Sequence, residues 1–300
     1  MTRSPWVCPL CREELIGGPG HVACSNNHTF DVARQGYVNL LTAAQRRSRQ
    51  PGDTKEMVDA RRRFLATGAY DRISDAIAHV VQRAGTAAAS RWPGACPRLV
   101  DIGCGEGHHT RRVDAALRSG IGGLDPVELE VAGIDVAKAA VALAARAHPG
   151  GSYAVASAAD IPLADESVDI AVNIFGPVIA DELARVVRGD GTVVIAHPGP
   201  AHLSALRTLV YDDPRPHEIK DPLRHASERF ARVGTMTVTF PVVVFDGPLA
   251  QDLFAMTPYR WHAPPRISTL LDAAAERPQG FETRADVIVS TYRRIARSSF

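Results

Sequence analysis

The sequence predicts an α/β fold whose sheet binds a ligand at the carboxyl ends of its strands, preceded by a small metal-binding module. Three observations support this prediction: a glycine-rich turn directly after the apolar run Leu99-Val100, alternating strand-like and helix-like segments from residue 98 onward, and closely spaced cysteines near the N-terminus. The 300 residues, 45% of them hydrophobic, suffice for one large α/β domain and a small additional module.

The glycine-rich turn is the most informative feature of the chain. Asp101 begins the run Asp-Ile-Gly-Cys-Gly-Glu-Gly, whose glycines are Gly103, Gly105 and Gly107. Glycines let the backbone turn tightly and approach a ligand closely. A dinucleotide-binding loop would read G-x-G-x-x-G, and its third glycine would fall at His108, so that pattern is excluded. The turn instead resembles the first motif of methyltransferases that use S-adenosylmethionine (SAM); the alternative interpretation is a surface turn.

This resemblance implies a Rossmann-like fold with a seven-stranded sheet and SAM at the strand ends. The segment 131–135 is predicted to be the second strand, and it ends in Asp135, whose carboxylate is placed to accept hydrogen bonds from the ribose hydroxyls. Asp160 follows the third strand, where an acid contacts the adenine amino group in many such enzymes. Taken singly, Asp135 could instead cap a helix, and Asp160 could be a turn residue.

The remaining segments fit the same alternating order. The gap between Gly105 and Asp135 exceeds the usual spacing of about 20 residues, and the glycine-rich stretch 119–126 is interpreted as a loop insertion that accounts for it. The pattern further predicts a helix at 137–147 and strands at 152–157, 168–175, 191–196, 235–245 and 285–292.

The N-terminal cysteines have the spacing of a zinc site. Cys8 and Cys11 form a CxxC pair, and Cys24 and His28 follow as a second pair. Three thiolates and one imidazole suit tetrahedral zinc, and because protein groups fill all four positions the site is predicted to be structural. His21 is a rival fourth ligand, and reduced structural cysteines or a redox CxxC are the alternatives to a metal site.

A basic connector follows the cysteine module. Asp53 and Glu56 have the spacing of a capping box that would begin a helix, with apolar residues including Met57 and Phe64 on one face. Two arginine clusters near a zinc module predict a surface that binds RNA phosphates, although a solvated helix face is the alternative. The six arginines are Arg46, Arg47, Arg49, Arg61, Arg62 and Arg63.

Charge and hydropathy restrict the possible partners. The net charge of +1 indicates little, but residues 1–70 carry ten Lys/Arg and six Asp/Glu, a net of +4. No apolar run approaches the ~18–20 residues of a membrane span, so we expect a cytoplasmic protein without a membrane partner. The predicted organisation is a zinc-binding RNA-recognition module at 1–41, a basic connector and helix at 42–70, and a SAM-dependent methyltransferase domain at 71–300.

Several motifs together resemble one family over nearly the whole chain. They are Cys-Pro-Leu-Cys, Gly-Tyr-Val-Asn-Leu-Leu, Arg-Ser-Arg-Gln-Pro-Gly-Asp, Ala-Arg-Arg-Arg-Phe-Leu, His-Pro-Gly-Pro-Ala-His-Leu and Met-Thr-Pro-Tyr, in addition to the glycine turn. This combination resembles the large-subunit (23S) rRNA guanine-N1 methyltransferases. The resemblance implies methylation of a guanine in a 23S rRNA hairpin loop at the peptide exit tunnel, structural zinc and a homodimer. One branch protects ribosomes against macrolides such as tylosin, and the alanine- and arginine-rich composition fits that branch.

The sequence does not single out a catalytic residue. Guanine N1 carries a proton that must be accepted during methylation, and four polar residues lie near plausible strand ends. They are Asn173, Asp181, His197 and His202. Phe175 or Tyr259 could stack on an extruded base. The competing functions are a small-molecule methyltransferase, which would leave the zinc module and arginines without a role, and a non-catalytic RNA-binding protein, against which the intact glycine turn and Asp135 argue.

Overall fold

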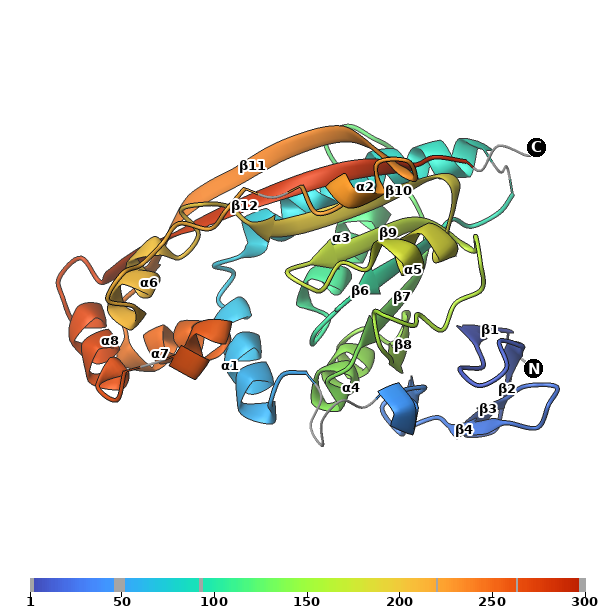
Figure 1. The fold of residues 1–300 in the computed structure, drawn as a ribbon, viewed down its shortest axis with the longest axis horizontal. Helices are drawn as coiled ribbons and strands as arrows, with labels where there is room; N and C mark the ends of the chain where they lie inside the picture. The colour runs from blue at the N-terminus through green and yellow to red at the C-terminus, as the bar shows by residue number, and fades with distance from the viewer. Residues whose placement is uncertain (1–2, 46–51, 92–93, 220, 263, 297–300) are drawn as a thin grey trace.

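The structure is a computed structural model that describes residues 3–45, 52–91, 94–219, 221–262 and 264–296. The chain forms two sheets, a small one of order β1-β2-β3-β4 and a large one of order β11-β12-β10-β9-β6-β7-β8-β5. Figure 1 shows the small sheet beside the β8 end of the large one, while β11 and β12 extend away from it. No helix within the described ranges is both long and apolar enough to cross a membrane.

The small sheet belongs to the cysteine-containing module. Its strands are antiparallel, and they are β1 (Arg3–Val7), β2 (Glu14–Gly18), β3 (His21–Ala23) and β4 (Thr29–Asp31). Trp6, Leu15 and Val22 are buried with Cys8 and Cys24 in a cluster that also contains residues of the large sheet. The module contributes few apolar side chains of its own, and a bound metal is therefore expected to supply much of its stability.

The large sheet has the Rossmann-like arrangement that the sequence predicts. Strands β10, β9, β6, β7 and β8 are parallel, whereas β12 runs antiparallel to both β10 and β11. The bounds are β6 (Arg98–Ile102), β7 (Glu130–Asp135), β8 (Ser152–Val155), β9 (Val168–Ile174), β10 (Val187–Pro198), β11 (Phe230–Val244) and β12 (Phe281–Arg294). Alternate side chains of β6 face opposite sides, so Leu99 packs in one core cluster and Val100 in the other.

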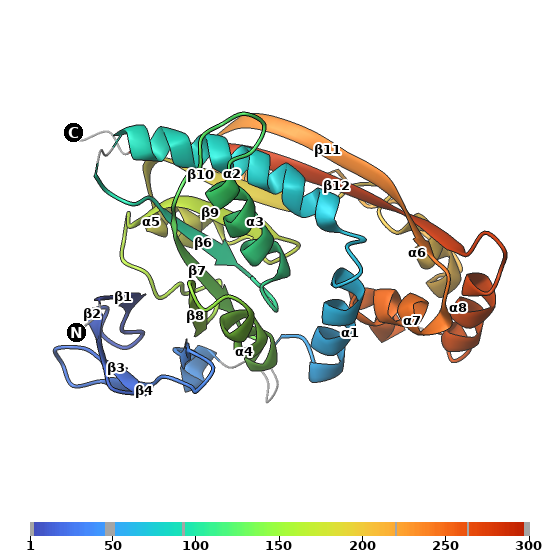
Figure 2. The ribbon, with the colours of Figure 1, turned by 180° about the vertical axis from the view of Figure 1, so that it is seen from behind.

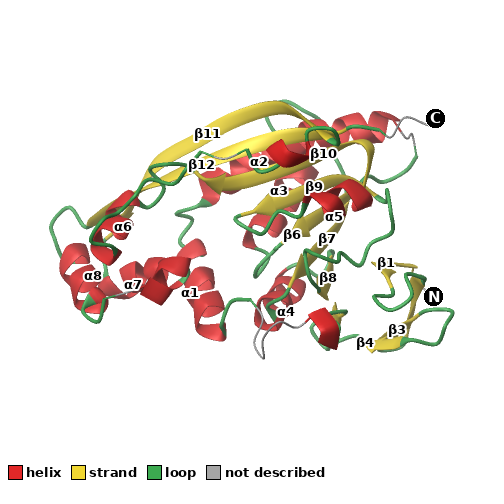
Figure 3. Cartoon of the chain, in the orientation of Figure 1, coloured by secondary structure: helices red, strands yellow, loops and turns green. Residues whose placement is uncertain are grey.

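Helices cover both faces of this sheet. Figure 2 shows α2 (Asp71–Arg91) and α3 (His108–Ser119) side by side on one face, and α5 (Ala180–Val186) packs on the opposite face. The other helices are α1 (Lys55–Leu65), α4 (Lys138–Ala147), α6 (Ser204–Val210), α7 (Gly247–Ala255) and α8 (Ile267–Ala275), with short 3-10 turns η1 (Ala43–Gln45), η2 (Arg224–Ala226) and η3 (Pro258–His262). Figure 3 shows α1, α6, α7 and α8 gathered near the C-terminal end of β11 and the N-terminal end of β12.

Two details differ from the sequence-based expectations. The short strand β5 (Tyr37–Asn39) pairs in parallel with β8, so residues predicted to belong to the separate N-terminal module add an eighth strand to the large sheet. Helix α1 is capped by Thr54, whose Oγ1 accepts the Met57 N–H at 3.3 Å, and not by Asp53, which lies one residue earlier. Threonine and aspartate are both common caps, so the sequence alone leaves the first residue of this helix open.

Candidate functional site

The main cavity lies at the carboxyl ends of β6, β7 and β9, where ligands bind in open α/β sheets. Its volume is about 500 Å³. The glycine turn forms its floor, α1 lies over it, and the segment around Met256–Trp261 closes one side. A chamber of this size, lined both by carboxylates and by aromatic rings, suits a polar organic ligand.

The glycine turn adopts backbone conformations that other residues rarely reach. Gly103, Gly105 and Gly107 have φ angles of 81°, 56° and 79°. The Gly105 N–H donates to Asp135 Oδ2 at 3.1 Å, so the first and second strand ends are held together. A Cβ at Gly107 would lie 2.9 Å from the Ala144 Cβ, so this glycine permits close packing of the turn on α4 and does not line the cavity.

Three carboxylates converge on the cavity. Asp101 Oδ1 and Glu106 Oε1 are buried without a hydrogen-bond partner. Burial raises the pKa of Asp101 to about 7 and raises the pKa of Glu106 and of Asp135. Buried carboxylate oxygens that lack a partner at a cavity wall favour a cationic ligand group, and the ammonium and sulfonium of SAM meet that requirement. Asp135 accepts the Ala137 N–H at 2.8 Å through Oδ1 and lines the same wall.

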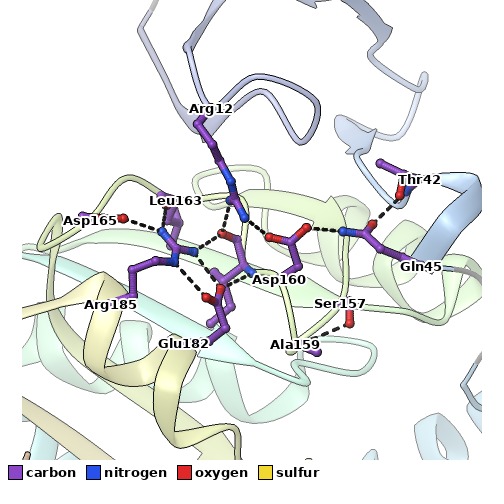
Figure 4. A network of polar contacts seen from close by, with 11 residues as sticks. Arg12, Thr42, Gln45, Ser157, Ala159, Asp160, Leu163, Asp165, Glu182 and Arg185 are labelled. Carbon is purple, nitrogen blue, oxygen red and sulfur yellow. Dashed lines mark hydrogen bonds and ion pairs between the residues drawn. The ribbon is translucent and has the colours of Figure 1, made fainter.

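The structure does not bring Asp160 to this cavity. Its carboxylate is held by the Arg12 guanidinium of the N-terminal module and by the side-chain amide of Gln45 (Figure 4). Arg12 also donates to the Ile161 carbonyl at 3.1 Å. The acid expected at the adenine ring therefore joins the module to the large sheet, and these contacts lend no support to a cofactor role.

The four predicted metal ligands lie together. Cys8, Cys11, Cys24 and His28 offer ligand atoms that all lie within 4.8 Å of one another. The His28 Nδ1 is 3.5, 3.4 and 3.4 Å from the three sulfurs, and the Cys11 and Cys24 sulfurs are 3.7 Å apart. A tetrahedron with Zn–S of about 2.3 Å and Zn–N of about 2.0–2.1 Å has edges of about 3.5–3.8 Å, so the arrangement fits zinc.

The rival ligand His21 is not a member of this group of ligand atoms, and its Nδ1 lies 3.1 Å from the Pro19 carbonyl. The side chain of Asn26 and the backbone at Glu13 lower the pKa of Cys11 to about 6, whereas burial raises the pKa of Cys8. Metal binding requires thiolates, so Cys11 is already suited to ligation at neutral pH.

The arginines predicted to bind RNA are in different environments. Arg46, Arg47 and Arg49 lie outside the described residues. Arg62 is exposed, and Arg63 makes a two-pronged contact with Asp252 at 2.8 and 2.6 Å. Arg61 lines the main cavity, where it pairs with Asp53. The cluster is therefore not one continuous basic face, because successive helix residues point about 100° apart.

The structure separates the four candidates for a proton-accepting group. Of these, His202 lines the main cavity. Asp181 is exposed and pairs with Arg229. Asn173 uses its amide nitrogen on the Ile102 and Pro177 carbonyls, both at 3.0 Å, and thereby supports the strand ends. His197 is not among the described residues that line the cavity.

His202 is fixed in one tautomer. Its Nδ1 accepts the Asp286 backbone N–H at 3.2 Å, so the neutral ring carries its proton on Nε2. Burial lowers the pKa of His202 to about 4, and the ring is therefore neutral at physiological pH. In this state His202 donates a hydrogen bond through Nε2 and is unsuited to accept a proton there.

The rings of Phe175, Tyr259 and Trp261 also line the cavity and form its aromatic end. Phe175 has a φ of 58°, a strained conformation for a non-glycine residue. The centroid of its ring lies 5.5 Å from the centroid of the His202 ring. Tyr259 is contacted by His217, whose Nε2 is 3.0 Å from the tyrosine hydroxyl. Sequence reasoning missed His217, which lies in a loop, and the exposed Trp261, which lies in the short turn η3, because neither segment has a periodicity that marks these residues.

Comparisons with known proteins agree with this geometry. A family profile described as "RlmA, N-terminal", a zinc ribbon, matches residues 6–49, and one described as "Methyltransferase domain" matches residues 100–195. A Streptomyces fradiae protein named 23S rRNA (guanine(748)-N(1))-methyltransferase is 35% identical over 86% of this chain and 86% of its own length. Relatives named in the same class come from Micromonospora griseorubida, at 35% identity over 90% of this chain and 92% of theirs, and from Bacillus subtilis, at 30% over 89% and 91%.

Proposed function

The chain belongs to the family of 23S rRNA (guanine-N1)-methyltransferases, and from this premise we propose that it methylates N1 of one guanine in a hairpin loop of 23S rRNA near the peptide exit tunnel. It is a SAM-dependent methyltransferase with an N-terminal zinc ribbon. The observation that carries the proposal is that one cavity is lined both by carboxylates with buried, unpartnered oxygens and by exposed aromatic rings.

We assign the carboxylate end of the cavity to the cofactor. Asp135 would accept hydrogen bonds from the ribose hydroxyls, and Asp101 and Glu106 would face the cationic groups. When bound there, SAM supplies a methyl group on a positively charged sulfur. The backbone of Gly103 and Gly105 lets the ligand approach closely, so the residues of this chain contribute chiefly alignment.

The aromatic end would receive the target base. N1 lies on the Watson–Crick edge of guanine, so the base must be unpaired or extruded, and a loop guanine costs less to extrude than one in a duplex. The half-exposed Phe175 ring offers a stacking surface, and the Nε2–H of the neighbouring His202 can donate to a carbonyl oxygen such as guanine O6. Such a hydrogen bond favours loss of the N1 proton, because it stabilises the negative charge that remains on the ring.

We assign acceptance of that proton to His217. Methyl transfer forms the N1–C bond, breaks the S–C bond and releases the N1 proton. Burial lowers the pKa of His217, which keeps the imidazole neutral near pH 7, and Tyr259 holds the ring at the cavity. A His217→Ala variant is expected to lower kcat more than it raises KM, and to remove the acid-side loss of kcat that the wild type shows at saturating SAM. An unchanged pH profile would contradict this assignment.

The zinc ribbon and the connector arginines other than Arg61, which lines the cavity, are proposed to hold the RNA above the strand ends. Cys8, Cys11, Cys24 and His28 are proposed as ligands of a structural zinc. An rRNA substrate implies action in the cytoplasm.

We also propose a homodimer. The long, largely exposed edge strand β11 offers a surface for it, and sedimentation analysis of the purified protein would test it. Protection against tylosin is the further proposal, and a strain expressing the protein should tolerate more drug than one expressing Asp135→Ala.

The principal test is primer extension on 23S rRNA from cells that lack the gene, after treatment with enzyme and SAM. Methylation at N1 blocks base pairing, so one new stop is expected in a hairpin loop. The stop should be absent with the Asp135→Ala variant and with an RNA hairpin whose target guanine is replaced by adenine. A stop that persists in both controls, or no stop on either naked RNA or ribosomal particles, would rule out the proposed function.

A further inference from the structure

One arginine of the connector helix faces away from the expected RNA surface. Met57, Arg61 and Leu65 lie four residues apart on α1, so they form one ridge of the helix, and all three line the main cavity. Arg62 is next in sequence and points elsewhere, where it is exposed. The helical period therefore assigns two neighbouring arginines to different environments.

The Arg61 guanidinium is held directly over the glycine turn. Its Nη2 lies 2.5 Å from Asp53 Oδ2 and donates to the Met256 carbonyl at 3.3 Å. Its Nη1 is 3.6 Å from the position that a Cβ at Gly105 would occupy. The Arg61 side chain is 25% exposed, so its charge acts in a partly desolvated space. These contacts orient the Nη1 side of the guanidinium toward the glycine turn.

The charges around the cavity are unequally distributed. Asp53, Asp101, Glu106 and Asp135 all contribute to its wall, whereas Arg61 is the sole lysine or arginine among the described residues that line it. The methionyl end of SAM carries a carboxylate as well as an ammonium. The four acids would repel that carboxylate, and a planar guanidinium is the group that best pairs with it.

We propose that Arg61 binds the carboxylate of the methionyl end of SAM, which makes it a cofactor-binding residue and not part of the RNA surface. The helix that follows the zinc ribbon thereby completes the cofactor site of the methyltransferase domain. Through the Met256 carbonyl the same guanidinium also contacts the segment that leads to Tyr259 at the aromatic end. This inference rests on the use of SAM by the chain, and its test is separable from that of the RNA substrate.

The test is calorimetric titration of the full-length protein with two ligands. S-adenosylhomocysteine has the carboxylate, and its decarboxylated analogue keeps the amine but lacks the carboxylate. The Arg61→Ala variant is expected to bind S-adenosylhomocysteine about 10- to 100-fold more weakly, the range for a lost charge-assisted pair, while its affinity for the decarboxylated analogue changes less than about twofold. The matched control Arg62→Ala should bind both ligands like the wild type.

Several results would overturn the proposal. Equal weakening of both ligands in Arg61→Ala would show that the residue shapes the cavity without recognising the carboxylate, and unchanged binding of S-adenosylhomocysteine would exclude any contact. If Arg61→Ala melts at a lower temperature than the wild type, both titrations are repeated with Arg61→Gln, which retains length and polarity. The ratio of its affinities for the two ligands is then decisive in the same way. A wild-type protein that binds neither ligand would instead refute the cofactor assignment itself.

Discussion

The buried carboxylate of Asp101 predicts that cofactor affinity depends on pH. Burial, opposed by the hydrogen bond from Thr110 and reinforced by the nearby Asp135 and Glu106, raises the pKa of Asp101 to about 7. A cationic ligand group beside the unpartnered Oδ1 favours the ionised form. Ligand binding should therefore release a proton from Asp101 wherever that group is protonated in the free protein.

The size of this effect follows from the pKa of about 7. About 9% of Asp101 is then ionised at pH 6 and about 91% at pH 8. If only the ionised form binds the ligand, affinity should fall about tenfold between pH 8 and pH 6. The direction follows from the sign of the shift: raising the pKa of an acid keeps it protonated to higher pH, so affinity is lost as the pH falls through that pKa.

The measurement is titration calorimetry with S-adenosylhomocysteine at several pH values, in buffers that differ in ionisation enthalpy. Release of close to one proton per bound ligand is expected near pH 6 and little near pH 8. The Asp101→Asn variant retains every other titrating group, including those of the ligand, so the difference between the two curves isolates Asp101. Parallel curves for wild type and variant would refute the reasoning.

The other predictions concern the N-terminal module and the RNA. Metal analysis should find about one zinc per chain, and His28→Ala should lose it while His21→Ala retains it; the opposite result would show that the ligand set is wrong. Arg12→Ala should speed proteolysis of the connector, and it should lower the free energy of unfolding by less than about 1 kcal/mol because the Arg12–Asp160 ion pair is partly exposed. As a control, substitution of the exposed Arg215 should affect neither quantity. Replacing the three arginines at positions 46, 47 and 49 should lower the slope of log affinity against log salt by about 0.7–0.9 per lost phosphate contact, with normal SAM affinity; an unchanged slope would return them to a solvated surface.

The parts of the site that sequence reasoning predicted are those set by local chemistry. The positions of the glycine turn and of Asp135 could be predicted because they lie at the ends of β6 and β7, which are neighbouring parallel strands, and because the turn needs glycine backbone conformations. The zinc ligands follow from two short pairs, because each CxxC-like loop brings its own members together. His28 was preferred over His21 on spacing, and the structure groups His28 with the three cysteines.

The parts that could not be predicted depend on contacts between distant segments. Asp160 was interpreted from its place after the third strand, but its partner Arg12 lies 148 residues away in sequence. Arg61 was grouped with its neighbours by charge, and only the packing of α1 over the cavity distinguishes it from Arg62. The strand β5 has three residues, too few for periodicity to indicate which sheet it joins.

The unexpected position of Asp160 explains how the two parts of the chain keep a fixed relation. Figure 4 shows Arg12 reaching from the zinc ribbon to Asp160, while Gln45 approaches the same carboxylate from the other side. Arg12 also donates a hydrogen bond to the Ile161 carbonyl. The Val7 N–H donates to the Pro162 carbonyl at 2.9 Å, and β5 continues the sheet beside β8. A surface ion pair alone stabilises little, but backbone pairing in two places restricts relative motion of the parts. An RNA held by the ribbon, as proposed above, would therefore be presented to the strand ends from a set distance, which would favour methylation of one base over its neighbours.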